Sequence, residues 1–173
     1  MSAVAAVGLG AAFLAWFLIV RPSDDGRGAA PPAPSAVVPK IASLADLRAL
    51  ADSGETFYWA GVRAGMRIEL TAPDGTVFIR YLPSGEQAGS AAPALTVATY
   101  PRSNGFEEVS RAAEGEDVTK LELSRGGLAV VDETNGTNVH LAYPGQPYQV
   151  EVYAPRVGEA RRLVANGTVR LYS

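Results

Sequence analysis

The single histidine of the chain, His140, has the side chain best suited to acid–base chemistry. The pKa of a free imidazole lies near neutrality, so histidine can accept and donate protons under physiological conditions. A catalytic triad would also need an acid such as Asp132 or Glu133 and a nucleophile such as Ser124, yet no serine lies in a G-x-S-x-G motif. His140 alternates with apolar neighbours over residues 138–143, which favours a solvent-facing histidine on a strand.

The chain contains few residues of the types that bind metal ions or cofactors. With no cysteine and one histidine, the chain cannot form a cysteine-ligated zinc or iron–sulfur centre or a multi-histidine metal site. Neither a calcium loop nor a Walker loop is present. The acidic clusters Glu107-Glu108, Glu114-Glu116-Asp117 and Asp132-Glu133 fall at expected helix ends and turns, where carboxylates are commonly solvated. We therefore expect no catalytic, cofactor-binding or metal-binding residues, and enzymatic activity is left open.

Aromatic and arginine side chains are the more informative chemical feature. Alternation along a strand places Phe57 and Trp59 on one face and Tyr58 on the other. Tyr, Trp and Arg dominate the energetic hot spots of binding surfaces, although they also fill cores and cover sheets. On this basis the candidate partner-binding residues are Tyr58, Trp59, Arg80, Tyr81 and His140.

The length of 173 residues allows one domain, with room for a small additional segment. The chain is 47% hydrophobic and 19% charged, which excludes a coiled coil and a highly charged disordered chain. Its formal net charge of −3 argues against a nucleic-acid-binding surface, which needs a basic excess.

The N-terminal segment predicts a membrane anchor over residues 1–21. Residues 3–20 contain no polar side chain, and as a helix they would span roughly 27 Å, close to the thickness of the bilayer core. Trp16 lies near one end and Arg21 follows the apolar segment directly. A buried core helix and a cleaved signal peptide are the alternatives. No basic residue precedes the segment, however, and the small residues Gly28-Ala29-Ala30 lie well beyond it.

Residues 22–40 have the composition of a semi-rigid linker. Five of the 12 prolines lie between residues 21 and 40, and proline favours an extended polyproline conformation. Two signals for membrane orientation conflict here. Arg21 and Arg27 favour a cytoplasmic C-terminal domain, whereas the Pro/Ala-rich linker favours an extracytoplasmic one, and we expect the latter.

Residues 41–173 predict an α+β domain with antiparallel sheet and about three helices. Ser43 and Asp46 form a capping-box pattern that starts a helix ending at Gly54, and further helices are expected over 104–114 and 157–165. Period-two alternation predicts strands over 56–60, 67–71, 77–82, 95–100, 118–123, 128–132, 138–143, 148–153 and 168–172. Pro73-Asp74-Gly75 supplies a hairpin turn between the second and third of these strands.

An internal duplication is one interpretation of this order. Residues 67–83 resemble 120–145, and residues 96–113 resemble 150–167, which would place Pro101-Arg102 and Pro155-Arg156 at equivalent corners. A duplicated unit of this kind predicts a curved antiparallel sheet with its helices on one face. Convergent turn chemistry explains the same similarity without a duplication.

Several short segments occur together in a familiar series, among them Tyr58-Trp59-Ala60-Gly61, Val77-Phe78-Ile79-Arg80-Tyr81-Leu82-Pro83 and Tyr148-Gln149-Val150-Glu151-Val152-Tyr153. With them, residues 47–171 resemble an uncharacterised family of membrane-anchored α+β proteins of high-GC Gram-positive (actinobacterial) bacteria. The resemblance implies a single-pass or lipid-anchored protein and implies no reaction or ligand.

The function expected from these features is a membrane-anchored, non-catalytic binding domain. Its partners would be the membrane, through residues 3–20, and a protein or envelope component. Two alternatives stay open. One is an envelope-associated hydrolase-like or enzyme accessory domain that uses carboxylates and His140, and the other is a structural protein that oligomerises through Gly8 and Gly10 of the anchor.

Overall fold

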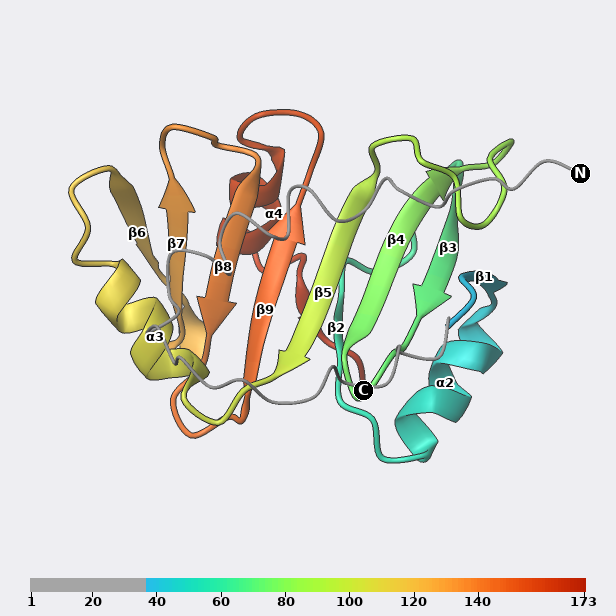
Figure 1. Cartoon of the computed structure of the whole chain (residues 1–173), viewed down its shortest axis with the longest axis horizontal. Helices are drawn as coiled ribbons and strands as arrows, with labels where there is room; N and C mark the ends of the chain where they lie inside the picture. The colour runs from blue at the N-terminus through green and yellow to red at the C-terminus, as the bar shows by residue number, and fades with distance from the viewer. Residues whose placement is uncertain (1–36) are drawn as a thin grey trace, which may run out of the picture. The chain divides into compact units, whose positions relative to one another are not determined.

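The structure, a computed structural model, describes residues 37–173 (Figure 1). The expected anchor over residues 1–21 lies outside the described residues, as does nearly all of the expected linker over 22–40. Within residues 37–173, no helix is both long enough and apolar enough to cross a membrane. The elements are, in chain order, β1 (Lys40–Ala42), α2 (Leu44–Asp52), β2 (Tyr58–Trp59), β3 (Met66–Thr71), β4 (Val77–Pro83), β5 (Leu95–Pro101), α3 (Gly105–Ala112), β6 (Val118–Glu122), the 3-10 turn η1 (Ser124–Gly126), β7 (Leu128–Asp132), β8 (Asn138–Ala142), β9 (Tyr148–Tyr153), α4 (Glu159–Ala165) and β10 (Arg170–Leu171).

Eight of the strands form one antiparallel sheet in the order β1-β3-β4-β5-β9-β8-β7-β6. At the centre of the sheet β5 pairs with β9, although these two strands lie far apart in the sequence (Figure 1). In this pairing Val97 lies opposite Val152. The last strand, β10, returns to pair with β2 and makes a separate two-stranded sheet. This pairing joins segments that lie more than 100 residues apart in the chain.

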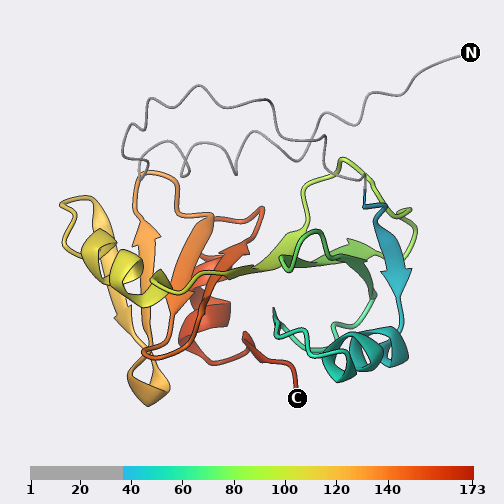
Figure 2. The ribbon, with the colours of Figure 1, turned by 60° about the horizontal axis from the view of Figure 1, so that its bottom comes forward.

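The large sheet is covered on both faces. We call the face bearing Val97 and Val152 the inner face, because their side chains belong to the main hydrophobic core with Leu47 of α2 and Leu163 of α4. The opposite, outer face carries α3, whose Val109 packs in a second cluster with residues of β7 and β8. Figure 2 shows α3 and α4 on opposite sides of the sheet.

Local sequence signals account for most of these elements. Ser43 and Asp46 form the predicted capping box at the start of α2, since each side chain receives a hydrogen bond from the other residue's backbone N–H. Asp74 and Gly75 both have positive φ, as a tight hairpin turn with the twist of β3 and β4 requires. The predicted α+β class, with a large antiparallel sheet and three helices in residues 37–173, is confirmed.

The placement of all helices on one face, which a duplication would predict, is not found in residues 37–173. Because α3 packs on the outer face, the left half of the sheet in Figure 1 lies between two helices. Equivalent residues of the two similar segments also lie on opposite faces of the sheet. Thr96 lies on the outer face beside Arg80, whereas its counterpart Val150 lies in the inner core. A two-fold axis that relates the two halves of an antiparallel sheet would keep equivalent residues on the same face, so this arrangement gives the duplication no support.

Three smaller differences concern the ends of elements. Lys40, expected at the end of the linker, already belongs to β1 and pairs with Leu70 of β3. Val157, expected as the first residue of the last helix, lies before α4 and is 77% exposed. Neither β1 nor η1 is predicted, because each is only three residues long and has no periodic pattern.

Candidate functional site

A cavity of about 310 Å³ opens beside β2 and the turn that joins β8 to β9. Four segments distant in sequence form its walls: β2, η1, the turn after β8 and the chain from α4 into β10. The lining residues are Tyr58, Ser124, Arg125, Tyr143, Pro144, Gln146, Gly167, Val169, Arg170 and Leu171. We call this cavity the Tyr–Arg pocket, after Tyr58, Tyr143, Arg125 and Arg170.

Two stacked tyrosines form one side of the pocket. The rings of Tyr58 and Tyr143 lie with their centroids 6.0 Å apart and nearly parallel. Tyr58 is held in place by its backbone N–H, which donates to the hydroxyl of Thr99 at 2.9 Å. Within residues 37–173, neither tyrosine hydroxyl has a hydrogen-bond partner. Both phenol groups are therefore available to a ligand.

The protonation state of the two tyrosines follows from burial and from a nearby charge. Burial, reinforced by Tyr143 and opposed by the positive charge of Arg125, raises the pKa of Tyr58 to about 12. Burial also raises the pKa of Tyr143, again against Arg125. Both hydroxyls thus stay protonated at neutral pH and can donate hydrogen bonds. Because Arg125 acts on both phenols, its guanidinium carries positive charge close to the stacked rings.

Arg170 reaches the pocket because β10 pairs with β2. In that register Arg170 lies opposite Trp59, and its guanidinium carbon is 5.8 Å from the centre of the indole ring, a cation–π distance. Trp59 is in turn in edge contact with Tyr172, which stacks on Phe57. Tyr58 points the other way, toward Tyr143, as the strand alternation predicts. The aromatic cluster therefore positions Arg170.

Arg125 occupies an unusual backbone conformation. Its φ of 58° and ψ of 26° lie in the left-handed region, which costs a residue with a side chain roughly 1–2 kcal/mol. Gly126 follows with φ of 74°. Strained residues of this kind concentrate at functional sites. Within residues 37–173 neither Arg125 nor Arg170 forms an ion pair, and no carboxylate lines the pocket.

Gly127 allows Tyr143 to approach the backbone, which leads to a direct test of the pocket wall. A Cβ atom at Gly127 would lie 2.4 Å from Cε1 of the Tyr143 ring, although the φ of −66° suits any residue. We expect Gly127→Ala to displace Tyr143 from Tyr58 and to lower the free energy of unfolding by about 1–3 kcal/mol, as overpacking does. Urea denaturation measures this change. Gly85→Ala is the control, because its Cβ meets nothing within 4 Å, and equal effects of the two substitutions would contradict the assigned contact.

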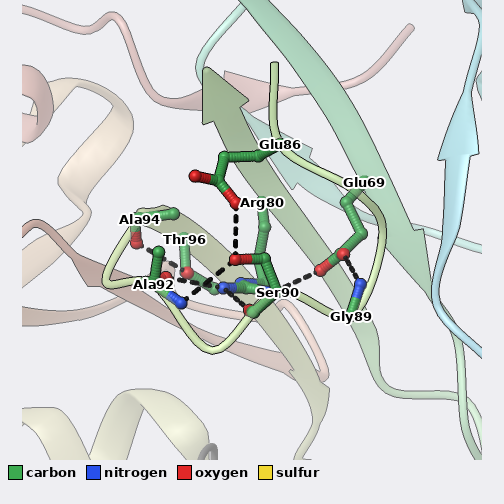
Figure 3. A network of polar contacts seen from close by, with 8 residues as sticks. All are labelled: Glu69, Arg80, Glu86, Gly89, Ser90, Ala92, Ala94 and Thr96. Atoms are coloured by element: carbon green, nitrogen blue, oxygen red, sulfur yellow. Dashed lines mark hydrogen bonds and ion pairs between the residues drawn. The ribbon is translucent and has the colours of Figure 1, made fainter. Parts of the chain in front are cut away.

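Arg80 and Tyr81, two of the expected binding residues, lie elsewhere and are buried. Tyr81 faces the inner core, where its hydroxyl accepts the Ala60 N–H at 2.7 Å and thereby supports the end of β2. Arg80 faces the outer side, where Nη1 lies 2.5 Å from Oε1 of Glu69. Figure 3 shows this ion pair beneath the loop of residues 84–94.

The loop is fastened to the ion pair through its backbone. Arg80 Nη2 donates to the carbonyls of Ser90 and Ala92, each at 3.0 Å, and the Gly89 N–H donates to the second oxygen of Glu69 (Figure 3). The Arg80 guanidinium and the Glu69 carboxylate are thus engaged within the protein. Arg80 therefore has a structural role in holding this loop and is not exposed to a binding partner.

His140, expected to face the solvent, is buried, and that expectation is wrong. It lies on the outer face, opposite Glu151 in the register of β8 and β9, with only 9% of its surface exposed. Burial lowers its pKa to about 4, against the negative charge of Asp132, which raises it. Ser124 lines the pocket on the inner side with Tyr143, so the sheet separates it from His140. His140 and Ser124 therefore do not form a catalytic triad with Asp132 or Glu133.

No protein-family profile matches the chain, and no curated protein or solved structure is significantly similar to it. The resemblance to membrane-anchored actinobacterial proteins stays a prediction.

Of the five expected binding residues, the structure places Tyr58 in the wall of the Tyr–Arg pocket and Trp59 behind it, against Arg170. Arg80, Tyr81 and His140 lie elsewhere and are buried. Arg125 and Arg170 were not singled out by sequence reasoning. Neither stands in a motif, and both reach the pocket through backbone geometry that is set by distant segments. The one sequence signal for this region is Ser124-Arg125-Gly126-Gly127, a turn-forming stretch between two strands.

Proposed function

We propose that this protein is a membrane-anchored, non-catalytic binding domain that holds an anionic ligand in the Tyr–Arg pocket. One observation carries the proposal: Arg125 and Arg170 line the same cavity with no carboxylate among the lining residues. In a chain with a net charge of −3, this places two positive charges together without neutralisation from within the site.

The chemistry of the lining suits an oxyanion. Guanidinium groups form charge-assisted hydrogen bonds with carboxylates and phosphates, and these are about twice as strong as neutral ones. The protonated hydroxyls of Tyr58 and Tyr143 add neutral donors. Aromatic rings on the same wall offer a flat surface to the rest of the ligand.

The test of this proposal is an NMR titration of the full chain in detergent micelles with inorganic phosphate and, separately, acetate. We expect saturable shifts of the arginine Nε–H signals, with dissociation constants on the order of millimolar, the affinity of a few solvated hydrogen bonds. Arg125→Gln and Arg170→Gln should each weaken the binding at least several-fold. Arg48→Gln on α2, which is exposed and outside the pocket, is the control. Linear shifts, or unchanged binding in both pocket variants, would refute the proposal.

The domain is proposed to lie outside the cytoplasm, with residues 3–20 in the membrane and a protein or envelope component as the source of the ligand. The chain has no cysteine, so Ser84→Cys introduces a unique thiol at an exposed position of the described domain. A membrane-impermeant maleimide is expected to label this variant in intact cells as completely as in lysed cells. Labelling that requires lysis would place the domain in the cytoplasm.

A further inference from the structure

The large sheet has two edge strands, and they differ in how readily another strand can join them. One edge is β1, a strand of three residues that follows Pro39. Short edge strands and proline both discourage pairing with another chain. The other edge is β6, a strand of five residues without proline (Figure 1). Within residues 37–173, β6 pairs only with β7, so its other side, which we call the free side, is open to a further strand.

The pairing of β6 with β7 shows which backbone groups of β6 point to the free side. Leu123, the residue after β6, donates its N–H to the Gly127 carbonyl at 2.8 Å. In an antiparallel pair, alternate residues of a strand direct their backbone groups to the same neighbour. Counting back from Leu123, the backbone groups of Val118, Lys120 and Glu122 therefore point away from β7 and toward the free side.

The side chains of β6 present opposite charges on the outer face of the sheet and an apolar group on the inner face. Lys120 and Glu122 lie opposite two residues of the second hydrophobic cluster, so they belong to the outer face. Their side chains are 51% and 86% exposed. Leu121 lies opposite Ala129 of the main core and belongs to the inner face. The strand therefore carries a cation, an apolar side chain and an anion at successive positions.

We propose that two copies of this chain pair antiparallel through β6, with Leu121 opposite its own counterpart on a two-fold axis. In this register Lys120 of each copy lies opposite Glu122 of the other, which gives two cross-strand ion pairs on the outer face. Both residues direct their backbone groups to the free side, so each facing pair exchanges two backbone hydrogen bonds. The two Leu121 side chains form a closely spaced apolar pair on the inner face. This contact is independent of the Tyr–Arg pocket.

The charges favour this register over the next one that uses the same backbone groups. Pairing with Lys120 opposite its own counterpart would bring two ammonium groups together and leave Glu122 opposite Val118. Like charges directly opposite each other destabilise a strand pair. A second copy in the proposed register is complementary to β6 in both charge and hydrogen bonding, which is why we assign it as the occupant of this edge.

A single cysteine tests the register directly, because the chain has none of its own. We expect Leu121→Cys to form an intermolecular disulfide when the full chain in detergent micelles is treated with diamide, which takes up the two electrons and two protons that the thiols lose. Thr119→Cys is the matched control on the same face. Its counterpart would lie four residues along the partner strand, roughly 13 Å away and beyond the reach of a disulfide. Equal cross-linking of the two variants, or none of Leu121→Cys, would overturn the proposal.

Charge reversal provides a second measurement, which decides the matter if Leu121→Cys fails to fold. Lys120→Glu and Glu122→Lys each turn two attractive pairs into repulsive ones, and each should raise the dimer dissociation constant roughly tenfold in sedimentation equilibrium of the full chain in micelles. The double variant Lys120→Glu/Glu122→Lys restores both pairs and should regain the wild-type constant.

Arg48→Glu, an exposed substitution on α2 away from β6, controls for the change in net charge and should leave the constant unaltered. Association through the anchor alone would give wild type and every charge variant the same constant, and that result would overturn the proposal. A chain that stays monomeric at all concentrations, or a double variant as weak as the single ones, would overturn it as well.

Discussion

Replacing Arg80 with methionine is expected to lower the free energy of unfolding by about 3–5 kcal/mol, because it leaves the buried carboxylate of Glu69 without its counter-charge. The Arg80 and Glu69 side chains are only 5% and 1% exposed. Methionine preserves much of the apolar volume of arginine but offers no donor to Glu69 or to the carbonyls of Ser90 and Ala92. The same change should release the loop of residues 84–94 and make it sensitive to limited proteolysis.

Arg63→Met is the matched control for this prediction. Arg63 also pairs with a glutamate, Glu159, at 3.4 Å, but both side chains are partly exposed. Pairs of that kind contribute less than about 1 kcal/mol. Urea denaturation should therefore separate the two substitutions clearly, and an Arg80→Met effect no larger than that of Arg63→Met would contradict the assignment. Adding Glu69→Gln to Arg80→Met should recover part of the loss, since it removes the unpaired charge.

The Glu69–Arg80 pair also shows what sequence can reveal. Pro73-Asp74-Gly75 predicts a two-residue hairpin turn, and a turn centred on Asp74 and Gly75 places Glu69 directly opposite Arg80. Opposite charges at facing positions of a hairpin indicate a pair. Residue type alone, taken without this register, marks Arg80 as a binding residue. The Glu69–Arg80 ion pair can therefore be predicted from the local sequence of this hairpin.

Elements that depend on local patterns were predicted closely. The strands over 128–132 and 148–153 have the expected bounds, because alternation and flanking turns define them without reference to the rest of the chain. The capping box of α2 is equally local. Helix α3 was placed correctly along the chain but on an unexpected face, since its apolar side fits whichever face the preceding connection reaches.

The candidate site depends on contacts that no local pattern encodes. Arg170 enters it only through the pairing of β10 with β2, and Arg125 only through a left-handed backbone conformation in η1. Tyr58 and Trp59 were recognised by residue type, which indicates what could bind but not where it would gather. Long-range strand pairing is therefore the missing step between the aromatic residues in the sequence and the Tyr–Arg pocket.

Acidification is expected to destabilise the domain through His140. Burial keeps the folded-state pKa of His140 near 4, whereas the unfolded chain takes up a proton near the ordinary value of 6.5. Between these values the unfolded state binds more protons, so the stability that is fully present above pH 6.5 is lost as pH falls toward 4. The shift corresponds to a loss of about 2–3 kcal/mol by pH 4.5.

The measurement is the difference in unfolding free energy between wild type and His140→Gln at pH 4.5 and 7.5. Relative to wild type, the unfolding free energy of the variant should be about 2–3 kcal/mol higher at the lower pH than at the higher one, because the variant has no imidazole to protonate when it unfolds.

Glu151, which lies opposite His140 in the pairing of β8 and β9, provides a control whose stability should change with pH in the opposite direction. Burial raises its pKa, against hydrogen bonds from Tyr100 and Asn138 that lower it. The unfolding free energy of Glu151→Gln should therefore increase relative to that of wild type as pH rises. A His140→Gln difference that does not change with pH would mean that the imidazole is protonated as freely in the folded protein as in water, which is the behaviour of a solvent-facing strand histidine.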